Sequence, residues 1–178
     1  MDAESDRCAA ELSDAAVDVL GYACLVAIMS MGFGYHRESQ ARLGKVTETN
    51  DHPAPVVTSA GALVEALKVM GAKKIAVVTP YMKPLTQLVV DYIANEGFEV
   101  LDSIALEIPD NLDVARHDPA RLPQIVAGLD YKDADVIVLS ACVQMPSLAS
   151  VAKVEALTGK PVLSAAIATT LSLIHISE

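Results

Sequence analysis

Two cysteines occupy positions at which a thiol could do chemistry. Cys142 follows the apolar run Val136 to Ser140, whose β-branched members and lack of charge predict a strand buried on both faces. Pro146 suits the first turn of a helix, because its missing N–H would be unpaired there anyway. Cys142 is therefore expected between the end of a parallel strand and the start of a helix, the edge of an α/β sheet at which ligands bind.

Such a position suits nucleophilic and acid–base chemistry. The first turn of a helix presents unpaired N–H groups and a partial positive charge. Both features favour a thiolate over a thiol, and both attract carboxylates. The thiolate is the nucleophilic form of cysteine, so a cysteine at the end of a strand is a candidate catalytic group.

The same arrangement occurs earlier in the chain. The apolar run Val17 to Val26 contains Cys24, preceded by alanine and followed by an aliphatic residue as Cys142 is. Residues 55–63, after the first cysteine, resemble residues 161–169, after the second. Two similar α/β units, each offering one strand-end cysteine, predict a pseudo-symmetric protein with a pair of thiols in its cleft.

Strands must alternate with helices to position these cysteines. Apolar runs and turn residues predict strands ending at Cys24 and at 56–57, 74–78, 98–106, 136–140 and 161–164. Helices are predicted at 1–15, 59–70, 84–96, 118–128 and 146–158. The stretches 30–50 and 107–117 are expected to be turns and loops. This order predicts an α/β protein with parallel sheets and helices on both faces.

The chain divides into two units on this pattern. Residues 1–71 are expected to form a partial first α/β lobe, and residues 72–170 a second lobe whose last segment could return to the first. Residues 171–178 do not continue the helical pattern and are expected to be a foreign tail. We expect the chain to be a fragment without the opening strand of its first lobe, less stable than its parent and inactive.

Composition and charge exclude several classes of function. The net charge is −10 without a basic cluster, which argues against a nucleic-acid partner. Three cysteines without close spacing argue against a disulfide framework and for a reducing compartment, so we expect a cytoplasmic protein. The sequence contains neither a Cys-x-x-Cys motif nor a pair of histidines at helical spacing, so we expect no metal site. The uncharged stretch Val19–Tyr35 contains three glycines and is assigned as strand, turn and helix and not as a membrane span.

The segments Gly21-Tyr-Ala-Cys24-Leu-Val-Ala-Ile-Met29 and Leu139-Ser-Ala-Cys142-Val-Gln-Met-Pro-Ser147 support a more specific interpretation. They resemble the two cysteine motifs of bacterial maleate cis-trans isomerases, a family of the aspartate/glutamate racemase superfamily. Residues 58–62, 79–81 and 108–111 also match that family in order. The resemblance implies two flavodoxin-like lobes related by pseudo-two-fold symmetry, the first of them incomplete here. It also implies a small dicarboxylate bound between the lobes, and a homodimer.

The resemblance also assigns roles to residues of this chain. It implies that Cys24 is the nucleophile and Cys142 the acid/base partner. Tyr81 and Asn111 would hold the substrate carboxylates. The residues beside the cysteines would line the substrate; these are Leu25, Val26, Val143 and Gln144. The family also uses a polar residue from a strand that would precede residue 1.

A pair of thiols suits this reaction on chemical grounds. A thiolate can add to one alkene carbon, which leaves a single bond free to rotate, and elimination then restores the alkene. The negative charge that develops beside the far carboxylate requires N–H donors or a proton from a second group. A thiol on the opposite lobe can supply that proton. The reaction needs neither a cofactor nor a metal.

Three alternatives stand beside this assignment. An amino-acid racemase would use the same thiols as two bases, but its cysteines are typically followed by Asn-Thr or Thr, and here Leu25 and Val143 follow. Arylmalonate decarboxylases resemble the fold but lack the first cysteine, so Cys24 counts against them. A non-catalytic ligand-binding module would carry these cysteines as inert core residues. In that case Tyr81 would only cover a sheet edge and Asn111 would be a turn residue.

Thiol labelling separates the catalytic assignment from the inert one. We expect iodoacetamide at neutral pH to modify Cys24 before Cys8, because the start of a helix favours the thiolate, whereas Cys8 lies in an acidic helix. Maleate should protect Cys24. Peptide mass spectrometry over time measures both rates, and equal rates that ignore maleate would contradict the assignment.

Overall fold

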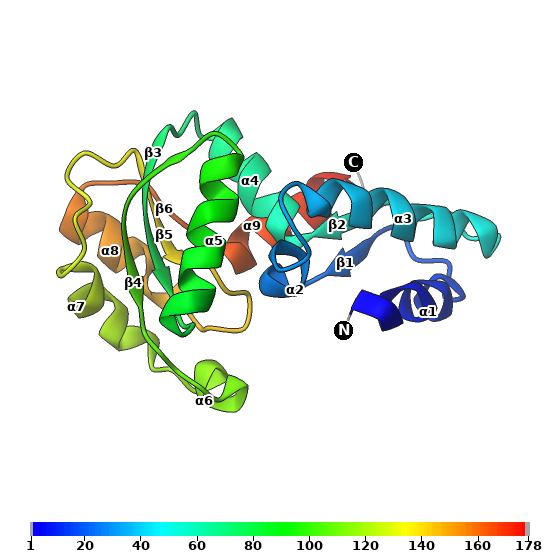
Figure 1. The fold of residues 1–178 in the computed structure, drawn as a ribbon, viewed down its shortest axis with the longest axis horizontal. Coiled ribbons are helices and arrows are strands. Elements are labelled where there is room, and N and C mark those ends of the chain that lie inside the picture. The colour runs from blue at the N-terminus through cyan, green and yellow to red at the C-terminus, as the bar shows by residue number, and fades with distance from the viewer. Residues whose placement is uncertain (1, 177–178) are drawn as a thin grey trace.

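Two parallel sheets organise the computed structural model, which describes residues 2–176 (Figure 1). The small sheet joins β1 (Leu20–Tyr22) to β2 (Val56–Thr58). The large sheet has four strands in the order β4-β3-β5-β6. They are β3 (Lys74–Thr79), β4 (Glu99–Ala105), β5 (Val136–Ser140) and β6 (Val162–Ser164). Each of these pairings is parallel, so the expected α/β class is confirmed.

Helices pack against both sheets. Those near the small sheet are α1 (Asp2–Ser13), α2 (Leu25–Met29), α3 (Tyr35–Thr49) and α4 (Ser59–Val69). Those near the large sheet are α5 (Lys83–Asn95), α6 (Asn111–Ala115), α7 (Leu122–Val126) and α8 (Val151–Thr158), with 3₁₀ turns at Pro119–Arg121 and Leu148–Ser150. The helix α9 (Ala165–Ile176) packs along α4 and contacts strands of both sheets, so these two helices lie between the sheets (Figure 1). Within the described residues, no helix is long and apolar enough to cross a membrane.

The large sheet is covered on both faces. On one face, Val136 and Val138 of β5 share the main core with residues of α4, α5 and α9. On the other face, Ile137 and Leu139 pack with residues of α7 and α8 in a second core. Successive side chains of a strand point to opposite faces, so two covered faces require an apolar residue at every position. This explains why β5 reads as a continuous apolar run.

The expectation of turns and loops at 30–50 is wrong from Tyr35 onward, because Tyr35–Thr49 form α3. This helix begins after Gly34, whose φ of +75° lies in the left-handed region. Its buried residues recur every three or four positions; they are His36, Ser39, Leu43 and Thr47. Three of these four are polar, so the buried face does not appear as an apolar pattern in the sequence.

The expected loop at 107–117 is also wrong in part, because it contains α6. The Asp110 carboxylate accepts a hydrogen bond from the N–H of Leu112 at 2.7 Å and caps this short helix. The strand expected to end at Cys24 is short, since β1 covers Leu20–Tyr22 alone. Local capping of this kind can occur at many aspartates, so sequence pattern by itself does not identify it.

Two helix boundaries near the second cysteine and the chain end also differ from expectation. Pro146 does not open a helix: a 3₁₀ turn starts at Leu148, because the buried side chain of Met145 keeps the preceding segment against the second core. The segment from 171 onward continues α9 as far as Ile176, since Leu173 packs beside Gly21 of β1. The last two residues of the expected tail, 177–178, lie outside the described residues.

Two helical glycines provide a test of this packing. Gly61→Ala is expected to destabilise the fold by about 1 kcal/mol or more, because its Cβ would lie 3.0 Å from Thr58 Oγ1 and 3.2 Å from His36 Cδ2. Gly44→Ala, whose Cβ would meet nothing within 4 Å, should stabilise the protein by about 0.5–1 kcal/mol through helix propensity. Chemical denaturation measures both changes, and the same sign for the two variants would contradict this packing.

Candidate active site

Cys24 stands at the amino terminus of α2, where the sequence predicted it. Its backbone is extended, with φ −131° and ψ 94°, and it occupies the N-cap position without a side-chain capping bond. The helix is anchored by Leu25, Ile28 and Met29, which are buried in the main core. The thiol of Cys24 is half-buried and free of any disulfide. Its position leaves it beside the unpaired N–H groups of the first turn of α2.

Cys142 lies two residues beyond the end of β5 and is 8% exposed. The expectation that a helix begins directly after it is wrong, because the 3₁₀ turn starts at Leu148. The N–H of the preceding Ala141 donates to Val78 O at 3.0 Å, which extends the contact between β5 and β3 by one residue beyond the strand. The edge of the sheet therefore positions Cys142, and no helix amino terminus lies directly after it.

Tyr81 lies beside the segment that carries Cys142. It follows β3, and its hydroxyl donates to the carbonyl oxygen of Ala141 at 3.1 Å. Burial raises the pKa of Tyr81 far above the ordinary range of tyrosine, and the charge and hydrogen bonding of Cys142 and the charge of Cys24 raise it further. The hydroxyl is thus close to Cys142 and within electrostatic reach of Cys24. At neutral pH it is a neutral hydrogen-bond donor beside the segment that carries Cys142.

The turn that carries Tyr81 is fixed by two buried threonines. Thr79, the last residue of β3, shares a 2.6 Å hydrogen bond between its Oγ1 and that of Thr86 on α5. The Thr86 hydroxyl also lies 3.4 Å from the carbonyl oxygen of Tyr81. These contacts hold the segment between β3 and α5, so the tyrosine side chain is directed back over the end of β5. Sequence analysis assigned no role to either threonine.

Asn111 and Gln144 are brought together by the fold. The Gln144 side-chain amide donates to the backbone carbonyl oxygen of Asn111 at 2.7 Å. Asn111 is the first residue of α6, and both residues are exposed. The bond joins the segment after β4 to the segment that carries Cys142. The proposed contacts of their side-chain amides with a substrate remain predictions.

The aliphatic neighbours of the cysteines differ in their exposure. The side chain of Leu25 is 1% exposed and belongs to the core, so this residue can offer a site its backbone N–H. Val26 and Val143 are partly buried and pack against the same core. They remain candidates for the apolar lining of a site. No set of three or more His, Cys, Asp and Glu side chains in the described part of the chain is placed to hold a metal ion.

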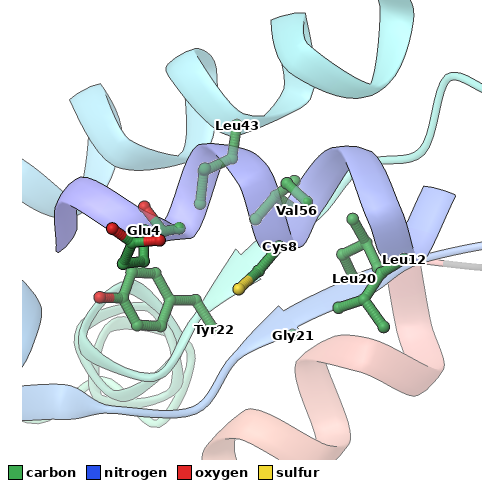
Figure 2. Close-up of a pocket in the computed structure, with 10 residues that line it drawn as sticks. Glu4, Cys8, Leu12, Leu20, Gly21, Tyr22, Leu43 and Val56 are labelled. Atoms are coloured by element: carbon green, nitrogen blue, oxygen red, sulfur yellow. The ribbon is translucent and has the colours of Figure 1, made fainter. Parts of the chain in front are cut away.

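A separate apolar groove contains the third cysteine. The groove has a volume of about 330 Å³ and lies between α1 and β1, with Cys8 and Leu12 on one side and Leu20 and Tyr22 on the other (Figure 2). Neither Cys24 nor Cys142 lines it. It is therefore distinct from the segments that carry Cys24, Tyr81 and Cys142.

Known proteins share both the sequence and the fold. Residues 5–178 match the family model described as arylmalonate decarboxylase. Over 174 residues the chain is 74% identical to a maleate isomerase of Pseudomonas putida, and the match covers 98% of this chain and 70% of that protein.

Two solved structures superimpose closely on this one. The maleate isomerase of Pseudomonas putida S16, crystallised with maleate as a cysteine-to-alanine variant, has 64% sequence identity and a TM-score of 0.96, over 97% of this chain and 69% of that chain. A cysteine-to-serine mutant of the Nocardia farcinica maleate cis-trans isomerase carries a covalently bound succinylcysteine intermediate. It has 42% identity and a TM-score of 0.96, over 99% of this chain and 72% of that chain.

The hydrogen bond of Tyr81 can be tested through stability. Tyr81→Phe should lower the free energy of unfolding by about 1–3 kcal/mol, because it leaves the buried carbonyl of Ala141 without this donor. Tyr131→Phe is the matched control, since this tyrosine packs at the edge of the second core, and we expect a change within about 0.5 kcal/mol. Urea unfolding followed by circular dichroism measures both, and equal changes would contradict the bonding described.

Proposed function

The chain belongs to the maleate isomerases, within the arylmalonate decarboxylase family, and on that premise we propose that it converts maleate to fumarate through a covalent adduct on Cys24. The observation that supports the proposal is the hydrogen bond from the Tyr81 hydroxyl to the carbonyl oxygen of Ala141, the residue directly before Cys142. Cys24 offers its thiol at the start of α2, and Cys142 offers a second thiol beside Tyr81.

The first half of the reaction forms a carbon–sulfur bond. A sulfur lone pair of the Cys24 thiolate attacks one alkene carbon, and the π electrons move to the other carbon, beside its carboxylate. The thiol of Cys142 gives its proton to that carbon and becomes a thiolate. The product is a succinyl group attached to Cys24, and its central carbon–carbon bond can now rotate.

The second half reverses these steps from the rotated conformer. The Cys142 thiolate removes the proton it gave, the electrons re-form the π bond, and the bond to Cys24 breaks. Both cysteines return to their starting protonation states, so the cycle consumes no oxidant, reductant or co-reactant. The carboxylates leave in the trans arrangement.

Neutral donors are proposed to hold the two carboxylates. The chain carries a net charge of −10, so a dianionic substrate gains little from the overall field. The N–H groups of the first turn of α2 and the protonated hydroxyl of Tyr81 supply local positive potential. Asn111 is proposed as a further donor, with Gln144 holding its backbone.

The racemase and decarboxylase alternatives are less well supported. Relatives of 74% and 60% identity are maleate isomerases, and the Nocardia farcinica relative holds a succinylcysteine, the adduct that this mechanism requires. A two-base racemase would form no such bond. We further infer a homodimer in a reducing, cytoplasmic setting. The homodimer rests on the family resemblance alone, and the three free cysteines support the setting.

Cysteine variants test the mechanism directly. Cys24→Ala should abolish the conversion of maleate to fumarate, because it removes the nucleophile. Cys142→Ala should reduce kcat by about 10²–10⁴-fold, the usual contribution of a general acid, while adduct can still accumulate on Cys24. Absorbance measures turnover, and intact-protein mass spectrometry measures the adduct.

Cys8→Ala is the control, since Cys8 lies in the groove beside α1 and should leave turnover unchanged. The Pseudomonas putida relative, assayed in parallel, establishes that the assay detects isomerisation. Near-parental turnover by Cys24→Ala would exclude the covalent mechanism. Turnover by the unmodified chain would show that the expectation of an inactive fragment is wrong, whereas absence of both turnover and adduct on Cys24 would count against the proposed function.

A further inference from the structure

The hydroxyl of Ser140 makes two hydrogen bonds to the backbone of Cys142. Ser140 is the last residue of β5 and is fully buried. Its Oγ donates to the carbonyl oxygen of Cys142 at 2.8 Å and accepts from the N–H of Cys142 at 3.3 Å. One side chain thereby satisfies both polar groups of the cysteine's own main chain.

These bonds occur where regular structure gives no support. From Ala141 to Ser147 the chain is neither strand nor helix. Ala141 is held by Val78 and by the hydroxyl of Tyr81. The N–H and C=O of the next residue, Cys142, have no place in the sheet ladder, and Ser140 supplies a hydrogen bond to each of them. A rotation there would move the sulfur away from Tyr81.

Other strands also end in a buried hydroxyl, but with a different arrangement. Thr58 of β2 accepts from the N–H of Gly61 at 3.1 Å, and Ser164 of β6 accepts from the N–H of Ile167 at 3.3 Å. Both therefore cap the helix that follows their strand. Ser140 is the register partner of Ser164 in the neighbouring strand, yet its hydroxyl turns to the residue that carries the thiol.

We propose that Ser140 is a positioning residue for the Cys142 thiol. Its hydroxyl bonds both polar groups of the Cys142 backbone, directly after the Ala141 carbonyl that the Tyr81 hydroxyl holds, and this fixes the orientation of the buried thiol. The consequence for turnover rests on the proposed isomerase function. The consequence for the thiol itself does not, so the two can fail separately.

The experiment compares three variants of the full chain. Ser140→Ala removes the hydroxyl, Ser140→Thr keeps it, and Ser164→Ala removes the equally buried hydroxyl of the register partner. Iodoacetamide labelling followed by peptide mass spectrometry gives a separate rate for each of the three cysteines. Thermal unfolding and the values of kcat and KM are measured on the same samples.

We expect Ser140→Ala to increase the labelling rate of Cys142 by about fivefold or more, because the loosened segment exposes a thiol that is now buried. The labelling rates of Cys8 and Cys24 should stay within about twofold of those in the unmodified chain, since neither residue takes part in the hydrogen bonds between Ser140 and Cys142. Turnover should change in the opposite direction: kcat should fall by about 10–100-fold with KM little changed. Ser140→Thr should restore both properties, and Ser164→Ala should label as the parent does.

Several results would overturn the proposal. An unchanged labelling rate for Cys142 in Ser140→Ala would do so, as would a parallel rise for all three cysteines, which would mean general destabilisation. Faster labelling with undiminished kcat would also overturn it. If the unmodified chain neither isomerises maleate nor forms an adduct on Cys24, the proposed function fails, but the labelling comparison still decides the positioning role. Should Ser140→Ala not fold, Ser140→Val is compared with Ser140→Thr, because these two side chains have nearly the same shape and only threonine carries the hydroxyl.

Discussion

Polar backbone groups at the ends of buried parallel strands must find hydrogen-bond partners, and this requirement shapes the whole molecule. Where the hydrogen-bond ladder of a strand covered on both faces ends, water does not reach the remaining backbone N–H and C=O groups. In this protein four strands end in a fully buried hydroxyl residue; they are Thr58, Thr79, Ser140 and Ser164. Each makes a hydrogen bond to the turn or helix that follows, so these bonds fix the sheet edge at the place where chemistry is proposed.

This rigidity explains how a site can be built from segments that are far apart in the chain. The end of β3 presents Tyr81, the end of β5 presents Cys142, and the start of α2 presents Cys24. The site proposed from them contains no charged pair. The proposed reaction uses a neutral phenol, peptide N–H groups and two thiols. These groups suffice because the negative charge develops only transiently, on the carbon beside a substrate carboxylate.

Much of this could be predicted from the sequence, because it depends on local pattern. The apolar run of β5 and the position of Cys24 before a helix follow from hydrophobicity and turn chemistry. The helix α3 could not be predicted, since its buried face includes His36, which bonds the hydroxyl of Tyr92 from another helix. The delayed helix after Cys142 likewise depends on a distant contact, the burial of Met145 in the second core. The hydroxyl residues at the strand ends can be read from the sequence, but their hydrogen-bond partners depend on the tertiary structure.

The placement of α9 has a consequence for how the protein reaches its native state. This helix contacts β1 and β2, which lie far before it in the chain, as well as β5 and β6 just ahead of it. The small sheet has two strands and relies on Leu173 of α9 for packing at Gly21. Contacts of such large sequence separation form slowly, because closing the long loop between them costs conformational entropy before the contacts stabilise the fold. The small sheet is therefore expected to be the last part of the molecule to consolidate, after the large sheet has assembled from contacts between neighbouring segments.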